Sequence, residues 1–240
     1  MKGSSDFLSS GSANEFQKVL KKYPQALKAK VKSKTKDNGL AKLDKWYQEE
    51  FGALVNSRSP AYMSSEDLVK MMKWKLSRGK FRPRLVQLAE SNAPDFVKST
   101  SEKGIKLAKQ NKVAAGITEL SKLKGVGPAT ASGVLAAVVP EKCCFFADEV
   151  AAAIPGLAPI KYTAEEYKMV NATISAAAKR LNDETSEDDW TPHNVELAVW
   201  TFAVLQSLAP DQLPVFNGKE KENSSNGEDD TRKRKRGDKR

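Results

Sequence analysis

Cysteine and histidine are scarce in this chain of 240 residues. Its two cysteines, Cys143 and Cys144, are adjacent, a spacing that predicts neither an intramolecular disulfide nor a pair of metal ligands. A single histidine makes a zinc site unexpected. We therefore expect a reducing intracellular compartment and no metal cofactor held by these side chains.

Long apolar runs and strand patterns are also missing. No run approaches the eighteen apolar residues of a membrane span, and the first residues lack the apolar core of a signal peptide, so we expect no membrane partner. Alternating, repeated and heptad patterns are absent, whereas 40% of the residues are hydrophobic, enough for a core. The sequence thus predicts an all-α fold with a disordered N-terminus (1–13), a folded domain (14–215) and a disordered basic tail (216–240).

Several local signals place helix starts within the folded part. Ser64 and Thr191 are typical N-cap residues, and Thr163 with Glu166 has the spacing of a capping box. Asn14 is expected to start the first helix, and Gly104 is expected to separate two short helices. His193 falls in the first turn of the last helix, where it could be a base or, as we prefer, an exposed or capping residue.

Charge is unevenly distributed. Residues 15–124 contain 25 Lys and Arg against 11 Asp and Glu, whereas residues 125–215 contain 5 against 12. A basic half ahead of an acidic half indicates a polyanion bound across one part of the molecule. The alternative is a solvated, lysine-rich surface.

The densest basic segment, which we call the basic patch, has seven cations and no acid in fifteen positions. Its members are Lys70, Lys73, Lys75, Arg78, Lys80, Arg82 and Arg84. Arginine can contact phosphate through two hydrogen bonds, so Arg78, Lys80 and Arg82 are candidate DNA contacts. Trp74 and Phe81 lie in the same patch; a core position is the preferred interpretation for both, and stacking on bases is the alternative.

Residues 113–139 predict two helices joined by a tight glycine turn. Val113, Ile117 and Leu120 share one helical face, and Gly125-Val126-Gly127 follows. Pro128 stands where a first helical residue belongs. Amides exposed by the glycines, next to a helix N-terminus, form a site suited to a phosphate.

The segment LKGVGPATA resembles the helix-hairpin-helix motif, which contacts nucleic-acid backbones. This resemblance implies DNA contacts by Lys124, Gly125, Val126, Gly127, Ala129 and Thr130. It also implies that the backbone carbonyls of Ser121, Leu123 and Val126 could hold a potassium or sodium ion. The alternative is a glycine-rich connector between helices that binds no ligand.

The run that follows the hairpin, residues 143–150, is similar to the corresponding segment of the helix-hairpin-helix (HhH-GPD) DNA glycosylase superfamily. An apolar stretch leads there to a catalytic aspartate at the start of a helix, which implies that Asp148 is the catalytic residue. The alternative is that Asp148 only caps the next helix. The resemblance covers residues 113–150 and is thin elsewhere.

Two departures from the superfamily bear on the chemistry. The lyase branch carries a nucleophilic lysine where this chain has Ala129, and some members have a four-cysteine iron–sulfur cluster that two cysteines cannot form. Catalysis would therefore follow the monofunctional pattern, with Asp148 and without abasic-site lyase activity through the usual lysine. Whether the chain is an enzyme is left open.

The sequence as a whole predicts a nuclear DNA-binding protein. The tail cluster Arg232, Lys233, Arg234, Lys235 and Arg236 is of the kind recognised by a nuclear import receptor. Our first hypothesis is a monofunctional glycosylase-like repair enzyme. The second is a non-catalytic DNA-binding or scaffold protein that kept the fold, and a third has the hairpin packing against protein while the charge serves RNA or chromatin.

Overall fold

The computed structural model describes residues 3–34, 39–82, 84–185 and 189–216, and every regular element in these ranges is helical. The predicted all-α fold is therefore confirmed. The helices, in chain order, are α1 (Ser4–Ser10), α2 (Ala13–Leu20), α3 (Tyr23–Lys32), α4 (Leu40–Trp46), the π-helical turn η1 (Tyr47–Phe51), α5 (Gly52–Asn56), α6 (Ser65–Arg78), α7 (Arg84–Glu90), α8 (Pro94–Lys109), α9 (Val113–Leu120), α10 (Pro128–Val138), α11 (Asp148–Ala152), α12 (Ala164–Thr185), α13 (Pro192–Leu208) and the short 3₁₀ helix η2 (Pro210–Gln212).

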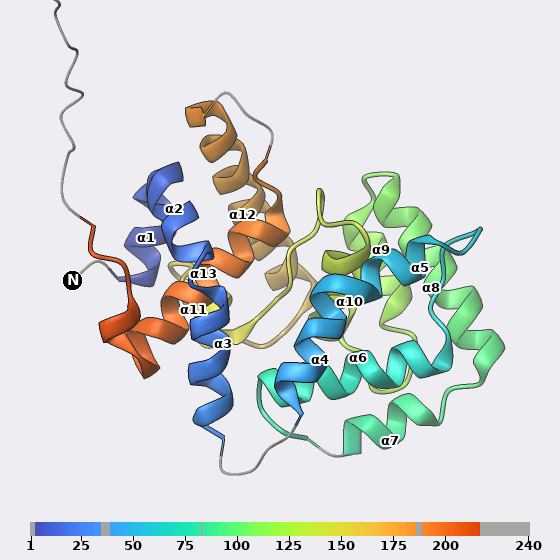
Figure 1. Cartoon of the computed structure of the whole chain (residues 1–240). Helices are drawn as coiled ribbons and strands as arrows, with labels where there is room; N and C mark the ends of the chain where they lie inside the picture. The colour runs from blue at the N-terminus through green and yellow to red at the C-terminus, as the bar shows by residue number, and fades with distance from the viewer. Residues whose placement is uncertain (1–2, 35–38, 83, 186–188, 217–240) are drawn as a thin grey trace, which may run out of the picture.

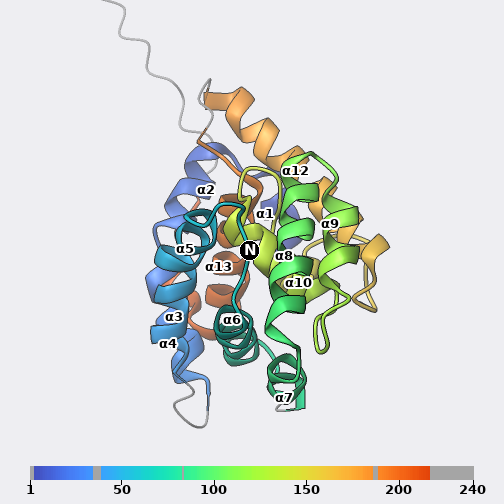
Figure 2. The same ribbon diagram turned by 90° about the vertical axis from the view of Figure 1, so that its right-hand side faces the viewer.

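The two ends of the chain pack together, and its middle forms a second group of helices. Helix α13 contacts α1, α2, α3, α11 and α12, which places the blue and orange helices of Figure 1 side by side. Helices α4 to α10 form the other group, in which α10 contacts α5, α6, α8 and α9. Figure 2 shows α8 and α9 running together on one side of this second group.

Local signals fixed the starts of several helices as expected. The Ser64 side chain accepts the amide of Asp67, and Thr191 accepts that of Asn194 at the start of α13. The predicted capping box ahead of α12 forms in both directions, because Thr163 accepts the Glu166 amide while Glu166 accepts the Thr163 amide.

Residues 4–10 form a helix, contrary to the expectation of a disordered segment over residues 1–13. Helix α1 covers Ser4–Ser10, and α2 begins at Ala13 with Ser12, not Asn14, as its cap. The ring of Phe7 is fully buried, stacked 4.2 Å from Phe16 and 4.5 Å from Phe202. Burying one such side chain contributes about 1.5–3 kcal/mol, which explains how a polar segment becomes helical.

Gly104 does not interrupt a helix but allows two helices to meet. Helix α8 runs through it from Pro94 to Lys109. A Cβ atom at Gly104 would lie 2.8 Å from Leu120, and one at Gly116 would lie 2.7 Å from the Gly104 carbonyl. The two glycines therefore let α8 and α9 approach backbone to backbone, and this contact supports the helix that leads into the hairpin.

Candidate functional site

The predicted hairpin segment forms two helices and a turn at the expected positions. Helix α9 ends at Leu120, Gly127 is the N-cap of α10, and Pro128 is its first residue. Gly125 has φ +80°, a conformation that glycine adopts without strain. Within the described ranges, the amides of Gly125, Gly127 and Ala129 donate to no hydrogen bond, so they are available to an acceptor.

Helix α7 supports this turn from outside. The Asn92 side chain, just beyond α7, accepts the Lys124 amide at 2.8 Å and donates to the Lys124 carbonyl at 3.1 Å. A Cβ atom at Gly125 would lie 3.0 Å from the Leu85 carbonyl, so α7 lies directly against the turn. Asn92 is buried, and its two bonds hold the peptide groups on both sides of Lys124. Sequence reasoning missed it, because nothing local connects positions 92 and 124.

A cavity of about 340 Å³ opens beside the turn. Its walls come from the end of α6 and the loop after it, from the turn with the start of α10, from the start of α11, and from residues 161–162. The volume is within the range of ligand-binding pockets in proteins. Candidate residues far apart in the sequence, among them Arg82, Gly127 and Asp148, thus lie around one space.

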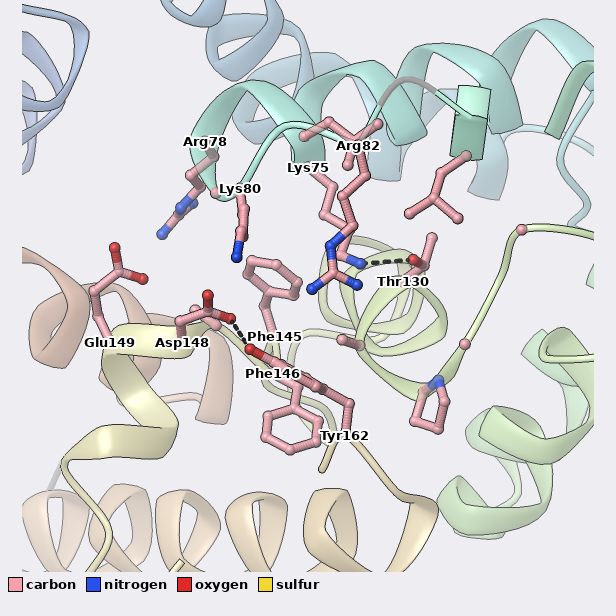
Figure 3. Close-up of a pocket in the computed structure, with 18 of the residues that line it drawn as sticks. Lys75, Arg78, Lys80, Arg82, Thr130, Phe145, Phe146, Asp148, Glu149 and Tyr162 are labelled. Atoms are coloured by element: carbon pink, nitrogen blue, oxygen red, sulfur yellow. Dashed lines mark hydrogen bonds between the residues drawn. The ribbon is translucent and has the colours of Figure 1, made fainter. Parts of the chain in front are cut away.

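Two walls of the cavity differ in charge (Figure 3). Lys75, Lys80 and Arg82 extend from the α6 side, and Asp148 lies opposite them. Asp148 is exposed, and its Oδ1 accepts the Tyr162 hydroxyl at 3.0 Å. Its bonding partner is therefore a tyrosine from the segment before α12, not a backbone amide of α11 as the capping alternative requires.

Tyr162 is held in an uncommon backbone conformation. Its φ is 59°, in the left-handed region, which costs a non-glycine residue of the order of 1–3 kcal/mol. Burial, followed by the hydrogen bond to Asp148 and that residue's charge, raises the pKa of Tyr162 to about 12. The phenol thus stays protonated and donates to the carboxylate across the neutral pH range.

Lys75 differs from the exposed cations of the cavity. Its Nζ donates to Thr130 Oγ1 at 3.0 Å. Burial lowers the pKa of Lys75, the charge of Asp148 acts in the opposite direction, and the charge of Arg82 lowers it further. Thr130 follows Ala129, so an amine from α6 reaches the start of α10, where the sequence itself has no lysine.

Arg78, a candidate DNA contact from the sequence, is held inside the protein. Although it borders the cavity, its side chain is only 3% exposed and lies 3.4 Å from Glu196 and 3.8 Å from Asp44. The guanidinium stacks 4.0 Å above the Trp200 ring. Such a group is bound inside the protein and is not free to contact DNA, because leaving those carboxylates would strand buried charge.

His193 belongs to the same interior region. Its Nδ1 lies 3.2 Å from Glu196, and its Nε2 lies 3.2 Å from Gln48. The side chain is 12% exposed, so the expectation of an exposed histidine is wrong, and it does not line the cavity.

The two aromatic residues of the basic patch have different positions. Trp74 is fully buried, as preferred, whereas Phe81 is 72% exposed, which overturns the core interpretation for that residue. Phe81 lies in the loop between Lys80 and Arg82, both of which line the cavity. An apolar ring is thus exposed to solvent in the loop that borders the cavity, although Phe81 is not among the residues that line it.

Most side chains of the remaining candidate residues in the turn are buried and leave only the backbone to contact a ligand. The side chains of Val126, Ala129 and Thr130 are buried, and Lys124 is exposed. Of the three carbonyls assigned to a monovalent ion, that of Leu123 already accepts the Val126 amide at 3.0 Å. The ion at the carbonyls of Ser121, Leu123 and Val126 therefore stays a prediction. The import cluster 232–236 and the tail beyond residue 216 lie outside the described residues.

Comparison with known proteins assigns this chain to no family. No protein-family model, curated protein or solved structure matches this chain. Along the described ranges, no helix combines the length and apolarity needed to span a membrane.

Proposed function

We propose that this chain binds the sugar-phosphate backbone of DNA at the α9–α10 turn and removes a damaged base in the adjacent cavity. One observation carries the proposal: unpaired backbone amides, exposed cations and the Asp148 carboxylate line the same space. Amides suit a phosphate, cations suit a polyanion, and a carboxylate suits a sugar carbon that becomes positively charged.

The phosphate would lie at the N-terminus of α10. The free amides of Gly125, Gly127 and Ala129 lie at this end of the helix, where the helix dipole favours an anion. Lys124, Lys80 and Arg82 are exposed and add attraction that does not depend on sequence. Binding should therefore weaken steeply as salt concentration rises.

Asp148 would act on the nucleotide held in the cavity. A base turned out of the duplex enters the space, and the carboxylate stabilises the positive charge that develops on the deoxyribose as the base leaves, or activates the attacking water. The hydroxyl of Tyr162 orients this carboxylate through its 3.0 Å hydrogen bond.

A non-catalytic DNA-binding module is the second candidate, and the same hydrogen bond favours it. A carboxylate held by Tyr162 can also serve only to fix the 161–162 segment against α11. In that case, Asp148 matters for stability and not for chemistry.

One assay separates these candidates. Duplexes carrying uracil, an alkylated base, an oxidised base or an abasic site are each tested for binding by gel shift and for base release. Asp148→Asn is the matched variant, because the amide oxygen can still accept the Tyr162 hydroxyl while the charge is lost. Release that disappears in the variant while binding persists supports the enzyme; binding without release in the wild type supports the module. Absence of binding to every duplex refutes the proposed function.

A further inference from the structure

Lys75 is a partly buried amine for which the described residues offer no ion-pair partner. Two other partly buried cations have a carboxylate partner, Lys30 with Glu149 at 2.7 Å and Arg58 with Asp67 at 2.6 Å, whereas Lys34 donates to the Gly79 carbonyl. Among the described residues Lys75 forms no ion pair, and its Nζ bonds only a neutral hydroxyl, that of Thr130. An amine placed in this way faces a cavity and is not consumed by a structural bridge.

The surroundings of this amine suit a sugar phosphate. Gly125 and Gly127, whose amides are unpaired, line the same cavity as the Asp148 carboxylate. A phosphate on the turn would bring the attached sugar into the space between Lys75 and Asp148, both of which line the cavity (Figure 3). The one strongly electrophilic carbon of an unsubstituted DNA sugar is the C1′ aldehyde of a ring-opened abasic site.

We propose that Lys75 is the nucleophile of a second activity, in which its amine forms an imine with the C1′ aldehyde of an abasic site in DNA. This inference rests on the proposed function, because the DNA must first occupy the cavity. It places the amine on α6, not on the hairpin, where position 129 is alanine.

The step balances without a cofactor. The neutral Nζ adds to C1′, and the resulting carbinolamine loses water to give the imine, which takes one proton from solvent. Loss of the C2′ proton to a base then lets the C3′–O bond break, so that its electron pair leaves with the 3′ phosphate. Water hydrolyses the imine and restores the amine of Lys75.

Burial makes this amine a better nucleophile. Because desolvation lowers the pKa of Lys75 and the charge of Arg82 adds to it, against the opposing effect of Asp148, a larger fraction is neutral at physiological pH than for an exposed lysine. The hydrogen bond to Thr130 directs Nζ to one wall without requiring the charged form.

The test is covalent trapping on a duplex with a single abasic site. Borohydride reduces an imine to a stable secondary amine, so a trapped adduct marks the reacting lysine after proteolysis and mass spectrometry. Lys75→Arg keeps the charge but removes the nucleophile, since arginine does not deprotonate in proteins. Lys168→Arg, an exposed change on α12 away from the cavity, is the matched control.

We expect an adduct on Lys75 in the wild type and in Lys168→Arg, and a yield at background in Lys75→Arg. Gel shifts on the same duplex show whether Lys75→Arg still binds, and mapping of the wild-type adduct needs no folded variant. A wild type that binds the duplex without forming an adduct, or forms it on another lysine, overturns the inference and leaves DNA binding standing. A wild type that binds no duplex overturns both.

Discussion

Gly127 offers the sharpest separation of DNA binding from folding. It is the N-cap of α10 with φ −110° and ψ −178°, an extended conformation open to any residue, and a Cβ atom there would meet no atom within 4 Å. Aspartate is a better N-cap than glycine by a few tenths of a kcal/mol. Gly127→Asp should therefore leave the free energy of unfolding unchanged or slightly higher.

The same carboxylate would face the bound phosphate. Two unit charges about 4–5 Å apart repel by about 1–3 kcal/mol at an effective dielectric between that of water and that of a protein surface, which is a loss of about 5- to 150-fold in affinity. Gly127→Asn is the matched control, because asparagine has the same shape and caps equally well without charge. The Asp and Asn variants thus differ by the charge alone.

Fluorescence anisotropy with a labelled duplex measures affinity at two salt concentrations, and urea denaturation measures stability. We expect the Asp variant to bind more weakly than the Asn variant, with a gap that narrows at high salt. Equal affinity of the Asp and Asn variants at low salt, with both folded, would refute the placement of a phosphate at this helix end.

Three further changes test other parts of the structure. Phe81→Ala should weaken DNA binding by about 1–3 kcal/mol, because the exposed ring is expected to stack on a base, and should keep the free energy of unfolding within about 0.5 kcal/mol of wild type. The control Phe96→Ala, on α8, should change neither quantity. Fluorescence anisotropy measures the affinity, and urea denaturation measures the stability. Gly116→Ala should destabilise the fold by about 1–3 kcal/mol, because its Cβ would lie 2.7 Å from the Gly104 carbonyl, and the urea midpoint reports this. Burial lowers the pKa of Lys75, so the unfolded chain binds the proton of this amine more tightly than the folded chain does. The free energy of unfolding should therefore rise as pH increases from the lowered pKa towards about 10.4, the value of an exposed lysine. Lys75→Met should reduce that rise, which urea denaturation at pH 7 and pH 9.5 measures.

The features that sequence reasoning predicted correctly are those that depend on near neighbours. Gly127 and Pro128 mark the start of α10, and the Thr163–Glu166 pair marks that of α12, because capping is settled within four residues. The same holds for Thr191 before α13. Asp148 is the first residue of α11, as the resemblance implied, but the N-cap of this helix is Ala147 and not Asp148.

The features that it missed depend on partners distant in the chain. Arg78 and Lys75 are three residues apart on α6, and the sequence places both in the basic patch. The carboxylates of Asp44 and Glu196, which come from α4 and α13, draw Arg78 into the interior. Only the packing of three helices distinguishes a structural arginine from a cavity lysine, and no local pattern carries that information.

The charges of the cavity also decide how a DNA strand could enter it. A phosphate cannot approach Asp148 without repulsion, and the neighbouring Glu149 is already paired with Lys30 at 2.7 Å. The turn at Gly127 carries no acidic residue and offers free amides. Lys80 and Arg82 extend into the cavity from the α6 side (Figure 3). The backbone would thus follow the hairpin side, and the sugar would face the carboxylate. With the phosphates on the hairpin side and the sugar next to Asp148, the carboxylate lies where positive charge develops on the sugar. A uniformly basic groove would not place a carboxylate at that position.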